Sequence, residues 1–421
     1  MTLFLPLYID PGTGSMLFSI LIGLAMTSVF ALRALIIKIK TAASFGKRTK
    51  LDKSHLGIVI FSDSKRYWNV FRPICDEFEK RGIDIAYWTM SPDDPLLSEQ
   101  YEHVKAEFIG EGNKAFARLN MMNAGICLST TPGLDVYQWK RSRNCGWYAH
   151  IPHTADELLG YRMFGLDFYD AVLLTGDFQG NYIRAIERMR GLRQKELVTV
   201  GCTYLDTMIK RLNSVADPKK DDTPTVLLAP SWGKDAILSK YGERIIDALL
   251  YTGFKIIIRP HPQTISSEKE IIEPLQRKYP NSEVLHWNYD NDNFSVLAQS
   301  DIMITDFSGI ILDYTFIFGK PLMYADTSLD TAPYDAAWFE ETNWRLRILP
   351  ELGVRLDEKD FPRLKEIIEE TLSSKKFEEN RIRIRDEAWQ NKGNATRSVA
   401  DYLIAKKQEL EADLPKKQQA V

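Results

Sequence analysis

Cysteine is scarce in this chain of 421 residues. The four cysteines lie far apart, and no two of them form a CxxC pair. This spacing argues against a structural zinc site and against a disulfide framework. An excess of one charge is also missing, because the net charge is -3 with 26% charged residues, so composition gives no reason to expect a nucleic-acid partner. We therefore predict reduced thiols, no nucleic acid and no metal site.

Two common nucleotide-binding motifs are also missing. The segment APSWGKD at 229–235 has the character of a turn between a strand and a helix, and it contains Gly233 and Lys234. It completes neither the GxGxxG pattern nor the Walker pattern. A dinucleotide-dependent redox enzyme and a P-loop NTPase therefore find little support, and we predict no cofactor.

Long hydrophobic runs are absent except for one. Residues 16–37 are apolar over the length that a helix needs to cross a bilayer, interrupted only by Arg33. A cleavable signal would carry basic residues before the run, whereas here they follow it. The positive-inside rule then predicts a single-pass anchor in the cell membrane with the later domains in the cytoplasm. The alternative is a buried or surface-lying helix, since Gly23 and Arg33 weaken the span. The basic residues that follow are Lys38, Lys40, Lys47, Arg48, Lys50 and Lys53.

The remaining sequence alternates short apolar strands with amphipathic helices, as in a parallel sheet. This rhythm starts near residue 56, pauses at a polar stretch at 213–223 and then begins again. We predict an α/β, GT-B-like fold in which two Rossmann-like domains face a central cleft. The expected parts are an anchor and basic linker at 1–55, a first domain at 56–212, and a second domain at 213–421 that includes C-terminal helices.

The strand ends of the second domain carry polar residues. Arg259 and His261 follow one apolar run, and Asp306, Ser308 and Gly309 follow another. In an open α/β sheet the ligand crevice lies outside the carboxyl ends of the strands. Ser308 is expected to cap the next helix, and a helix start in such a crevice also attracts anions. We predict that these five residues bind a phosphate-bearing ligand.

Three further residues belong to the same predicted site. Ser231 and Lys234 lie in the APSWGKD turn. Asp313 lies inside the helix after Gly309, where it contacts a ribose, orients a donor or is a solvated helix carboxylate. His261 has proline on both sides, which prevents the strand from continuing and holds the imidazole at the crevice edge.

Two histidines end a strand of the first domain, in the segment YAHIPHT. Their spacing offers no convincing third metal ligand, so a general base is the better role for His150 or His153. Such a base needs an orienting partner, for which Asp156 and Glu157 are candidates. Packing of both histidines between strand and helix is the structural alternative. Residue pattern alone leaves the choice between the two histidines open.

Four segments, in this order and at these spacings, resemble the CDP-glycerol glycerophosphotransferase family, which has a GT-B fold and includes the teichoic-acid polymerases. The segments are APSWG, RPHP, SDIMITDFSGIILDY and GKPLMYAD. The segment YAHIPHT resembles the part of that family that carries the histidine base, although Thr154 and Ala155 follow His153 where the family usually has a small residue and proline. The resemblance implies a CDP-glycerol-type donor, with His261 and Ser308 near its diphosphate.

This resemblance implies a transferase that moves glycerol phosphate, or a related polyol phosphate, from a CDP-linked donor to a lipid-linked or polymeric acceptor, and the predicted membrane anchor is consistent with it. In that reaction His153 deprotonates the acceptor hydroxyl. Two other hypotheses keep the fold. One is a GT-B glycosyltransferase that uses a nucleotide sugar for surface polysaccharide synthesis, and the other is a non-catalytic nucleotide-binding scaffold of the cell envelope.

Overall fold

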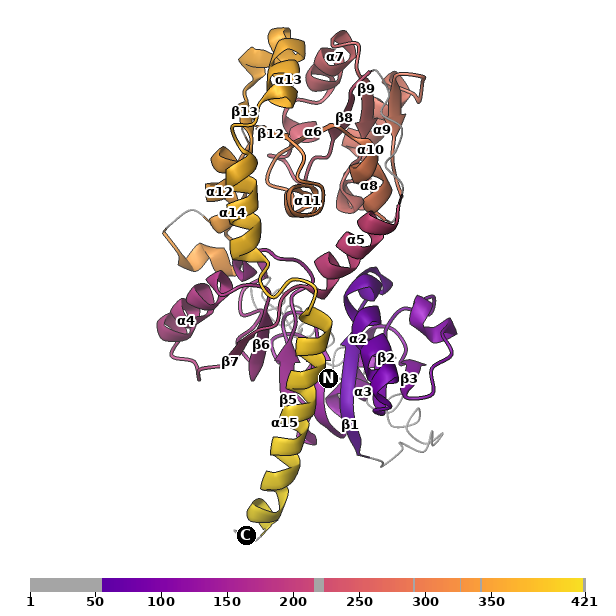
Figure 1. The fold of residues 1–421 in the computed structure, drawn as a ribbon, viewed down its shortest axis with the longest axis vertical. Coiled ribbons are helices and arrows are strands. Elements are labelled where there is room, and N and C mark those ends of the chain that lie inside the picture. The colour runs from indigo at the N-terminus through magenta and orange to yellow at the C-terminus, as the bar shows by residue number, and fades with distance from the viewer. Residues whose placement is uncertain (1–54, 216–222, 291, 326, 341–342, 419–421) are drawn as a thin grey trace, which may run out of the picture. The chain divides into compact units, whose positions relative to one another are not determined.

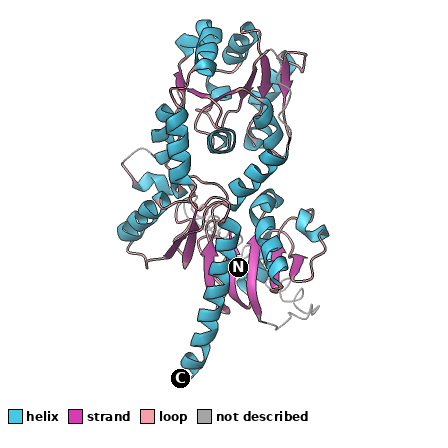
Figure 2. Ribbon diagram, in the orientation of Figure 1, coloured by secondary structure: helices cyan, strands magenta, loops and turns pink. Residues whose placement is uncertain are grey.

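Two parallel β-sheets organise the protein. The computed structural model describes residues 55–215, 223–290, 292–325, 327–340 and 343–418. The first sheet has the strand order β3-β2-β1-β4-β5-β6-β7, and the second has the order β10-β9-β8-β11-β12-β13. Apolar clusters lie on both faces of each sheet, where helices cover them (Figure 2). This is the predicted α/β architecture of two Rossmann-like sheets.

The strands are short, nearly continuous apolar runs, as expected for sheets that are buried on both faces. Ile58, Val59, Ile60 and Phe61 of β1 are all 0–1% exposed. The sequence pattern did not predict the short edge strands β10 and β13. The strands are β1 Leu56–Ser62, β2 Ile85–Thr89, β3 Val104–Phe108, β4 Ala124–Ser129, β5 Cys145–His150, β6 Ala171–Leu174, β7 Glu196–Thr199, β8 Thr225–Leu228, β9 Lys255–Ile258, β10 Leu285–Trp287, β11 Ile302–Thr305, β12 Leu322–Ala325 and β13 Val354–Leu356.

The helices follow the amphipathic segments, and two of them show how glycine sets a boundary. α2 ends at Gly82, which adopts a left-handed conformation (φ 67°). Gly242 (φ 49°) separates α6 from α7. The helices are α2 Trp68–Arg81, α3 Gly112–Asn120, α4 Phe178–Arg190, α5 Thr203–Ser214, α6 Ile237–Lys240, α7 Glu243–Tyr251, α8 Pro262–Ser267, α9 Lys269–Lys278, α10 Phe294–Gln299, α11 Ile310–Asp313, α12 Trp344–Leu352, α13 Leu364–Ser373, α14 Glu378–Ala388 and α15 Ala395–Gln418, with shorter turns η1 Lys65–Tyr67, η2 Pro95–Ser98, η3 Leu158–Gly160, η4 Tyr314–Phe318, η5 Asp335–Trp338 and η6 Glu358–Arg363.

Each sheet has one point at which the order of its strands reverses. In the first sheet this point lies between β1 and β4, and in the second it lies between β8 and β11. The loops after these strands leave in opposite directions and form a crevice at the carboxyl edge of the sheet. The loop segments concerned are 63–64 and 130–133 in the first sheet, and 229–236 and 306–309 in the second.

The last helix differs from the predicted domain division. Val399, Ala400 and Leu403 of α15 are 0% exposed and pack in one cluster with Ile58 and Ile60 of β1. α15 therefore covers the first sheet, and Figure 1 shows it running beside β5. The prediction that all C-terminal helices belong to the second domain is wrong for α15, because its apolar face completes the core of the first sheet.

A shared apolar cluster joins the two sheets. It contains Leu205 and Met208 of α5, Leu312 and Tyr314 from the segment after β11, and Trp389 after α14.

The four cysteines are buried, free thiols: Cys75, Cys127, Cys145 and Cys202.

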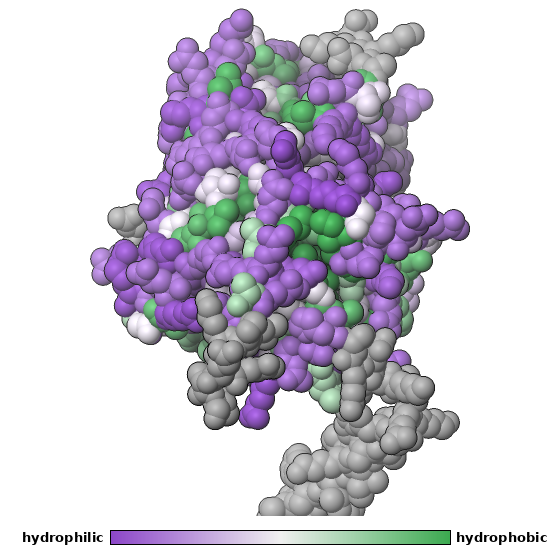
Figure 3. Space-filling view, turned by 60° about the horizontal axis from the view of Figure 1, so that its bottom comes forward, coloured by the Kyte–Doolittle hydropathy of each residue, from purple (hydrophilic) through white to green (hydrophobic). Residues whose placement is uncertain are grey.

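The predicted membrane anchor at 16–37 lies outside the described residues. Among the helices that the structure does describe, none combines the length and the apolar character that a membrane span requires. Figure 3 shows hydrophobic residues as separate patches within a mostly hydrophilic face.

Candidate functional site

Asp306 organises the crevice of the second sheet. Its carboxylate accepts hydrogen bonds from the backbone N–H groups of Ser231 (2.8 Å), Ile237 (3.1 Å) and Ser308 (3.2 Å). Asp306 is 1% exposed, and burial raises its pKa to about 6. Both oxygens are therefore used to tie the loop after β8 to the loop after β11. Asp306 therefore positions these two loops, and its carboxylate is not exposed to a ligand.

The turn at Ser308 and Gly309 lies where the sequence predicted, but its cap is different. Gly309 occupies the N-cap position of α11, and no side chain makes a capping hydrogen bond there. The expectation that Ser308 caps this helix is wrong, because Ser308 lies one residue earlier. Arg345 donates from Nη1 to the Phe307 carbonyl oxygen (2.9 Å) and holds the turn from the other side.

Arg259 lies at the end of β9 but its guanidinium is already bonded within the protein. Nη1 donates to Asn288 Oδ1, and Nη2 donates to the Asp290 carbonyl oxygen and to Asn293 Oδ1, both at 2.6 Å. Arg259 is 8% exposed. These contacts tie β9 to the segment after β10, so the predicted contact between Arg259 and phosphate would require some of them to change.

His261 is placed at the crevice edge by the turn that follows β9. Its Nδ1 accepts a hydrogen bond from the Gln263 N–H (3.1 Å) at the start of α8. Nε2 therefore carries the proton of the neutral ring and can donate it. Burial and the charge of Arg66 lower the pKa of His261 to about 4. The indole of Trp232, which is 41% exposed, stacks against this imidazole with ring centroids 6.4 Å apart.

The remaining predicted residues of this half differ in exposure. Ser231 is buried, and Lys234 is exposed. Neither side chain has a hydrogen-bond partner in the part of the chain that the structure describes. Asp313 is buried, accepts a hydrogen bond from Tyr204 Oη (3.1 Å), and has a pKa that burial raises to about 7. Asp313 is therefore not the solvated carboxylate that the sequence allowed.

His150 and His153 occupy different environments at the end of β5. His150 is 0% exposed, its Nε2 lies 2.9 Å from Tyr161 Oη, and its ring meets those of Tyr161 and Tyr169 edge-on. Burial, with a smaller effect of the neighbouring histidine, lowers the pKa of His150 to about 3. These contacts match the structural alternative, in which the histidine is packed between strand and helix.

His153 is only partly buried and lies beyond the strand end. Its Nδ1 is 3.3 Å from Thr130 Oγ1, and its ring packs on Tyr67 with centroids 5.0 Å apart. Burial and the charge of Arg66 lower its pKa to about 4. The charge of Arg66 lowers the pKa of His153 and also that of His261. One histidine from each sheet therefore lies within the electrostatic influence of Arg66.

The predicted orienting carboxylates do not contact either histidine. Asp156 pairs with Arg345 (Oδ2 to Nη2, 2.9 Å), and Glu157 accepts a hydrogen bond from the Trp344 N–H (2.5 Å). Burial is the main cause that raises the pKa of both carboxyls. Asp156 and Glu157 connect the first sheet to the start of α12, and the group that lies at the ring of His153 is the Thr130 hydroxyl.

Sequence reasoning missed the loop after β1. Asp63 and Arg66 follow a strand that the pattern identified, in the polar segment SDSKR. The signal that could have found them is the same rule that found Asp306, since β1 is a central strand and its loop lies at the reversal of strand order.

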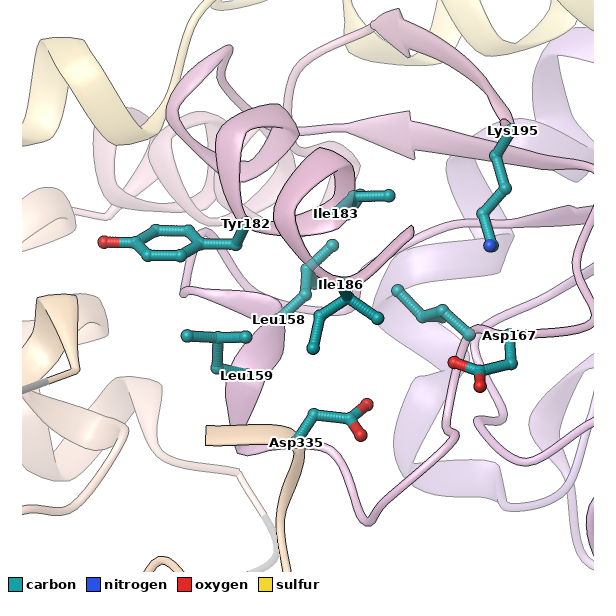
Figure 4. A pocket seen from close by; sticks show the side chains of 9 residues that line it. Leu158, Leu159, Asp167, Tyr182, Ile183, Ile186, Lys195 and Asp335 are labelled. Carbon is teal, nitrogen blue, oxygen red and sulfur yellow. The ribbon is translucent and has the colours of Figure 1, made fainter. Parts of the chain in front are cut away.

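A small cavity lies away from these residues. It has a volume of about 20 Å³ and is lined mainly by apolar side chains of η3 and α4, with Asp167, Lys195 and Asp335 at one side (Figure 4). Arg190 forms buried ion pairs with Asp167 and Asp335 beside it. The space suffices for about one water molecule, so we assign this cavity to packing rather than to a substrate.

One segment of the chain is similar to a known protein family. A model of the CDP-glycerol:poly(glycerophosphate) glycerophosphotransferase family matches residues 175–345. This segment is therefore similar to that family. The match includes the loops that carry Lys234, His261 and Asp306, and it ends at Arg345. It does not include His150 or His153.

Solved structures show the same fold at low sequence identity. A structure of the wall teichoic acid polymerase TagF soaked with CDPG is 14% identical, with a TM-score of 0.55, and covers 92% of this chain and 98% of that chain. UDP-GlcNAc 2-epimerases from Neisseria meningitidis and Methanocaldococcus jannaschii are each 13% identical, have TM-scores of 0.52 and 0.51, and cover 84% of this chain and 100% of theirs. These likenesses establish the GT-B-like fold. No curated protein matches the chain.

Proposed function

We propose that this protein transfers glycerol phosphate, or a related polyol phosphate, from a CDP-linked donor to a hydroxyl of a cell-surface glycopolymer or its lipid-linked precursor. The observation that carries the proposal is that the family match includes the loops at both sides of the β8–β11 crevice. Those loops carry Lys234 and Gly309, and His261 follows the neighbouring strand β9 at the same carboxyl edge of the sheet. Such groups suit a diphosphate.

The proposed reaction is a displacement at phosphorus. The acceptor oxygen attacks the β-phosphorus of the donor and forms a new P–O bond. The bond from that phosphorus to the oxygen that bridges the two phosphates breaks, and CMP leaves with this oxygen. Since a phosphoryl transfer needs mainly positioning and charge stabilisation, the protein supplies a base and fixed hydrogen-bond donors.

We assign the base to His153. When Nδ1–H donates to Thr130 Oγ1, the lone pair of Nε2 can take the proton of the acceptor hydroxyl. The ring is neutral near pH 7 because burial lowers its pKa. His150 is less suited to this role, since its Nε2 is in contact with Tyr161 and its ring is fully buried.

On the nucleotide side, His261 is the counterpart of this base. Its Nε2–H points away from the Gln263 contact and can donate to a phosphate oxygen. Lys234 adds a positive charge without a protein partner in the described residues. Asp306 acts through the loops that it holds.

We also propose that residues 16–37 anchor the protein in the cell membrane, with both sheets in the cytoplasm. What supports this is the apolar run followed by six basic residues within 38–53. The full chain should sediment with membranes and should resist protease in intact protoplasts. A chain that begins at His55 should stay in the supernatant. A full chain that also stays in the supernatant would contradict the anchor.

The activity test uses the purified full chain in detergent with CDP-[14C]glycerol, UDP-sugars and GDP-sugars. Release of CMP with transfer of label to an acceptor supports the proposal. Release of UDP or GDP instead would establish the glycosyltransferase hypothesis. If a variant with alanine at both His153 and His261 keeps full function in cells, the non-catalytic scaffold replaces both.

A further inference from the structure

The β1–β4 crevice of the first sheet contains a second set of polar groups. The proposed function assigns no ligand to them. In the parallel pairing of β1 with β4, Phe61 is opposite Ser129. Continuing this register by two residues places Asp63 beside Thr131, at the point where the strand order reverses. This is the position at which an α/β sheet binds its ligand.

Two buried oxygen atoms at this point make no contact with good hydrogen-bond geometry. Asp63 Oδ1 and Thr131 Oγ1 are the two atoms, and the Thr131 hydroxyl lies close enough to Asp63 to oppose the rise that burial causes in the pKa of its carboxyl. The backbone around them is nevertheless fixed, because Tyr169 Oη donates to the Thr131 carbonyl oxygen (2.6 Å) and Thr131 N–H donates to Ser129 Oγ (3.1 Å). Buried polar groups are normally hydrogen-bonded, so an ordered loop that presents two such atoms is suited to a ligand that carries hydroxyl groups.

Arg66 supplies a positive charge next to these atoms. Its Nε donates to Ser64 Oγ (3.2 Å), and its guanidinium lies over the ring of Tyr67 at 5.4 Å. Tyr67 in turn packs on His153. Arg66 is exposed and forms no ion pair with any described residue. Its two terminal nitrogens therefore remain available to an anion, and a guanidinium is well shaped for phosphate oxygens.

We propose that Asp63, Thr131 and Arg66 bind the end group of the acceptor. Asp63 accepts a hydrogen bond from a hydroxyl of the terminal polyol, and Thr131 binds a second hydroxyl or a neighbouring oxygen. Arg66 binds the phosphodiester that joins this polyol to the rest of the polymer. The attacking hydroxyl then lies beside His153. The assignment rests on the proposed function and adds to it the residues that recognise the acceptor.

Neighbouring residues provide matched controls. Lys65 precedes Arg66 on the same turn, but its ammonium is paired with Asp93 at the surface. A Lys65→Ala variant removes one positive charge from the same loop without removing the unpaired guanidinium. An Arg66→Lys variant keeps a charge and loses the planar fork, so it should recover part of the effect of Arg66→Ala.

The experiment compares two soluble acceptors with the full chain and CDP-[14C]glycerol. Glycerophosphoglycerol carries a phosphodiester next to its terminal glycerol, and free glycerol does not. Arg66→Ala should raise the KM for glycerophosphoglycerol about 10-fold or more, from the loss of a charged hydrogen bond, and should raise the KM for glycerol and for CDP-glycerol much less. Asp63→Asn and Thr131→Val should raise the KM for both acceptors. Lys65→Ala should match the unchanged chain.

Three results would overturn the inference: an equal rise of the CDP-glycerol KM in Arg66→Ala, an equal effect of Lys65→Ala, or no change of acceptor KM in any variant. Thermal unfolding of each variant separates these results from a folding defect. If the chain does not release CMP at all, the proposed function fails. Calorimetric binding of glycerophosphoglycerol to the unchanged chain and to Arg66→Ala then still decides whether this site binds a phosphodiester.

Discussion

The two crevices of this protein use their polar groups in opposite ways. At the β8–β11 crevice, Asp306 accepts hydrogen bonds from three backbone N–H groups, and Arg259 is bonded to the segment after β10. At the β1–β4 crevice, Asp63 Oδ1 and Thr131 Oγ1 are buried and make no contact with good hydrogen-bond geometry, although the two side chains lie near each other. The same strand topology therefore supports one crevice that is held by its own contacts and another whose contacts are incomplete.

The difference indicates how each side recognises a ligand. Asp306 holds the amides and side chains of its loops in place, which would reduce the cost of ordering them when the donor that we propose binds. The β1–β4 crevice instead offers unbonded oxygens and a guanidinium to a ligand with hydroxyls and a phosphate. The family match includes the β8–β11 crevice and excludes the β1–β4 crevice.

The largest test of this comparison is His153→Ala. Loss of a general base should lower kcat about 10²- to 10⁴-fold, with little change in the KM for CDP-glycerol, because the residue belongs to the acceptor side. In the unchanged protein the acidic limb of kcat/KM should lie near pH 4 rather than near the ordinary histidine value, because burial and Arg66 lower the pKa of His153 to about 4. The rates are measured by CMP release.

His150→Asn is the matched variant for that test. His150 is fully buried, so its replacement should lower the midpoint of thermal unfolding and leave most of kcat at low temperature. If His150→Asn removes the activity of a folded protein while His153→Ala does not, the two histidines exchange roles.

The next effect concerns the contact that joins the two sides. Arg345→Gln leaves the buried Asp156 carboxylate without its partner (side-chain exposures 15% and 9%). Removing one member of a buried ion pair destabilises a protein by about 3–5 kcal/mol. Urea unfolding measures this loss. The double variant with Asp156→Asn should recover part of it, and equal stability of all three proteins would contradict the role of this pair.

A smaller effect is expected for Asp306→Asn. An amide cannot accept all three N–H groups as the carboxylate does, so unfolding should become easier by about 1–3 kcal/mol. The KM for CDP-glycerol should rise, while the KM for the acceptor should not. Asp63→Asn should show the reverse pattern. Identical patterns in the two variants would mean that the two crevices do not bind separate ligands.

The smallest effect is a pH dependence of stability. Burial and the charge of Asp156 raise the pKa of Glu157 to about 7. The folded protein then holds a proton that the unfolded chain has lost, so the contribution of Glu157 to stability is present below its ordinary pKa and is lost as the pH rises through the raised value. Between pH 6 and pH 8, Glu157→Gln should lose less unfolding free energy than the unchanged chain, by about 1 kcal/mol. Parallel losses in the two proteins would contradict the assignment, and the exposed Glu99→Gln is the control.

The strands and turns of the second sheet could be predicted from sequence because their signals are local. A short β-branched run followed by Pro-His-Pro or Asp-Phe-Ser-Gly indicates a strand and its turn without knowledge of any distant residue, and the structure has β9 and β11 there. The hydrogen bonds of Arg259 could not be predicted, because its partners Asn288 and Asn293 come from another loop.

Hydrophobic patterning by itself determined that this chain forms two parallel sheets with polar turns at their carboxyl ends, since strand and helix periods are properties of neighbouring residues. The tertiary structure decided that His150 is the buried histidine of the two. It pairs Asp156 with Arg345 and bonds Glu157 to the Trp344 N–H. It also packs α15 on the first sheet. It also brought Arg66 close enough to His153 to lower the pKa of its imidazole. These outcomes depend on contacts between segments that are far apart in the chain, and such contacts leave no periodic trace in the sequence.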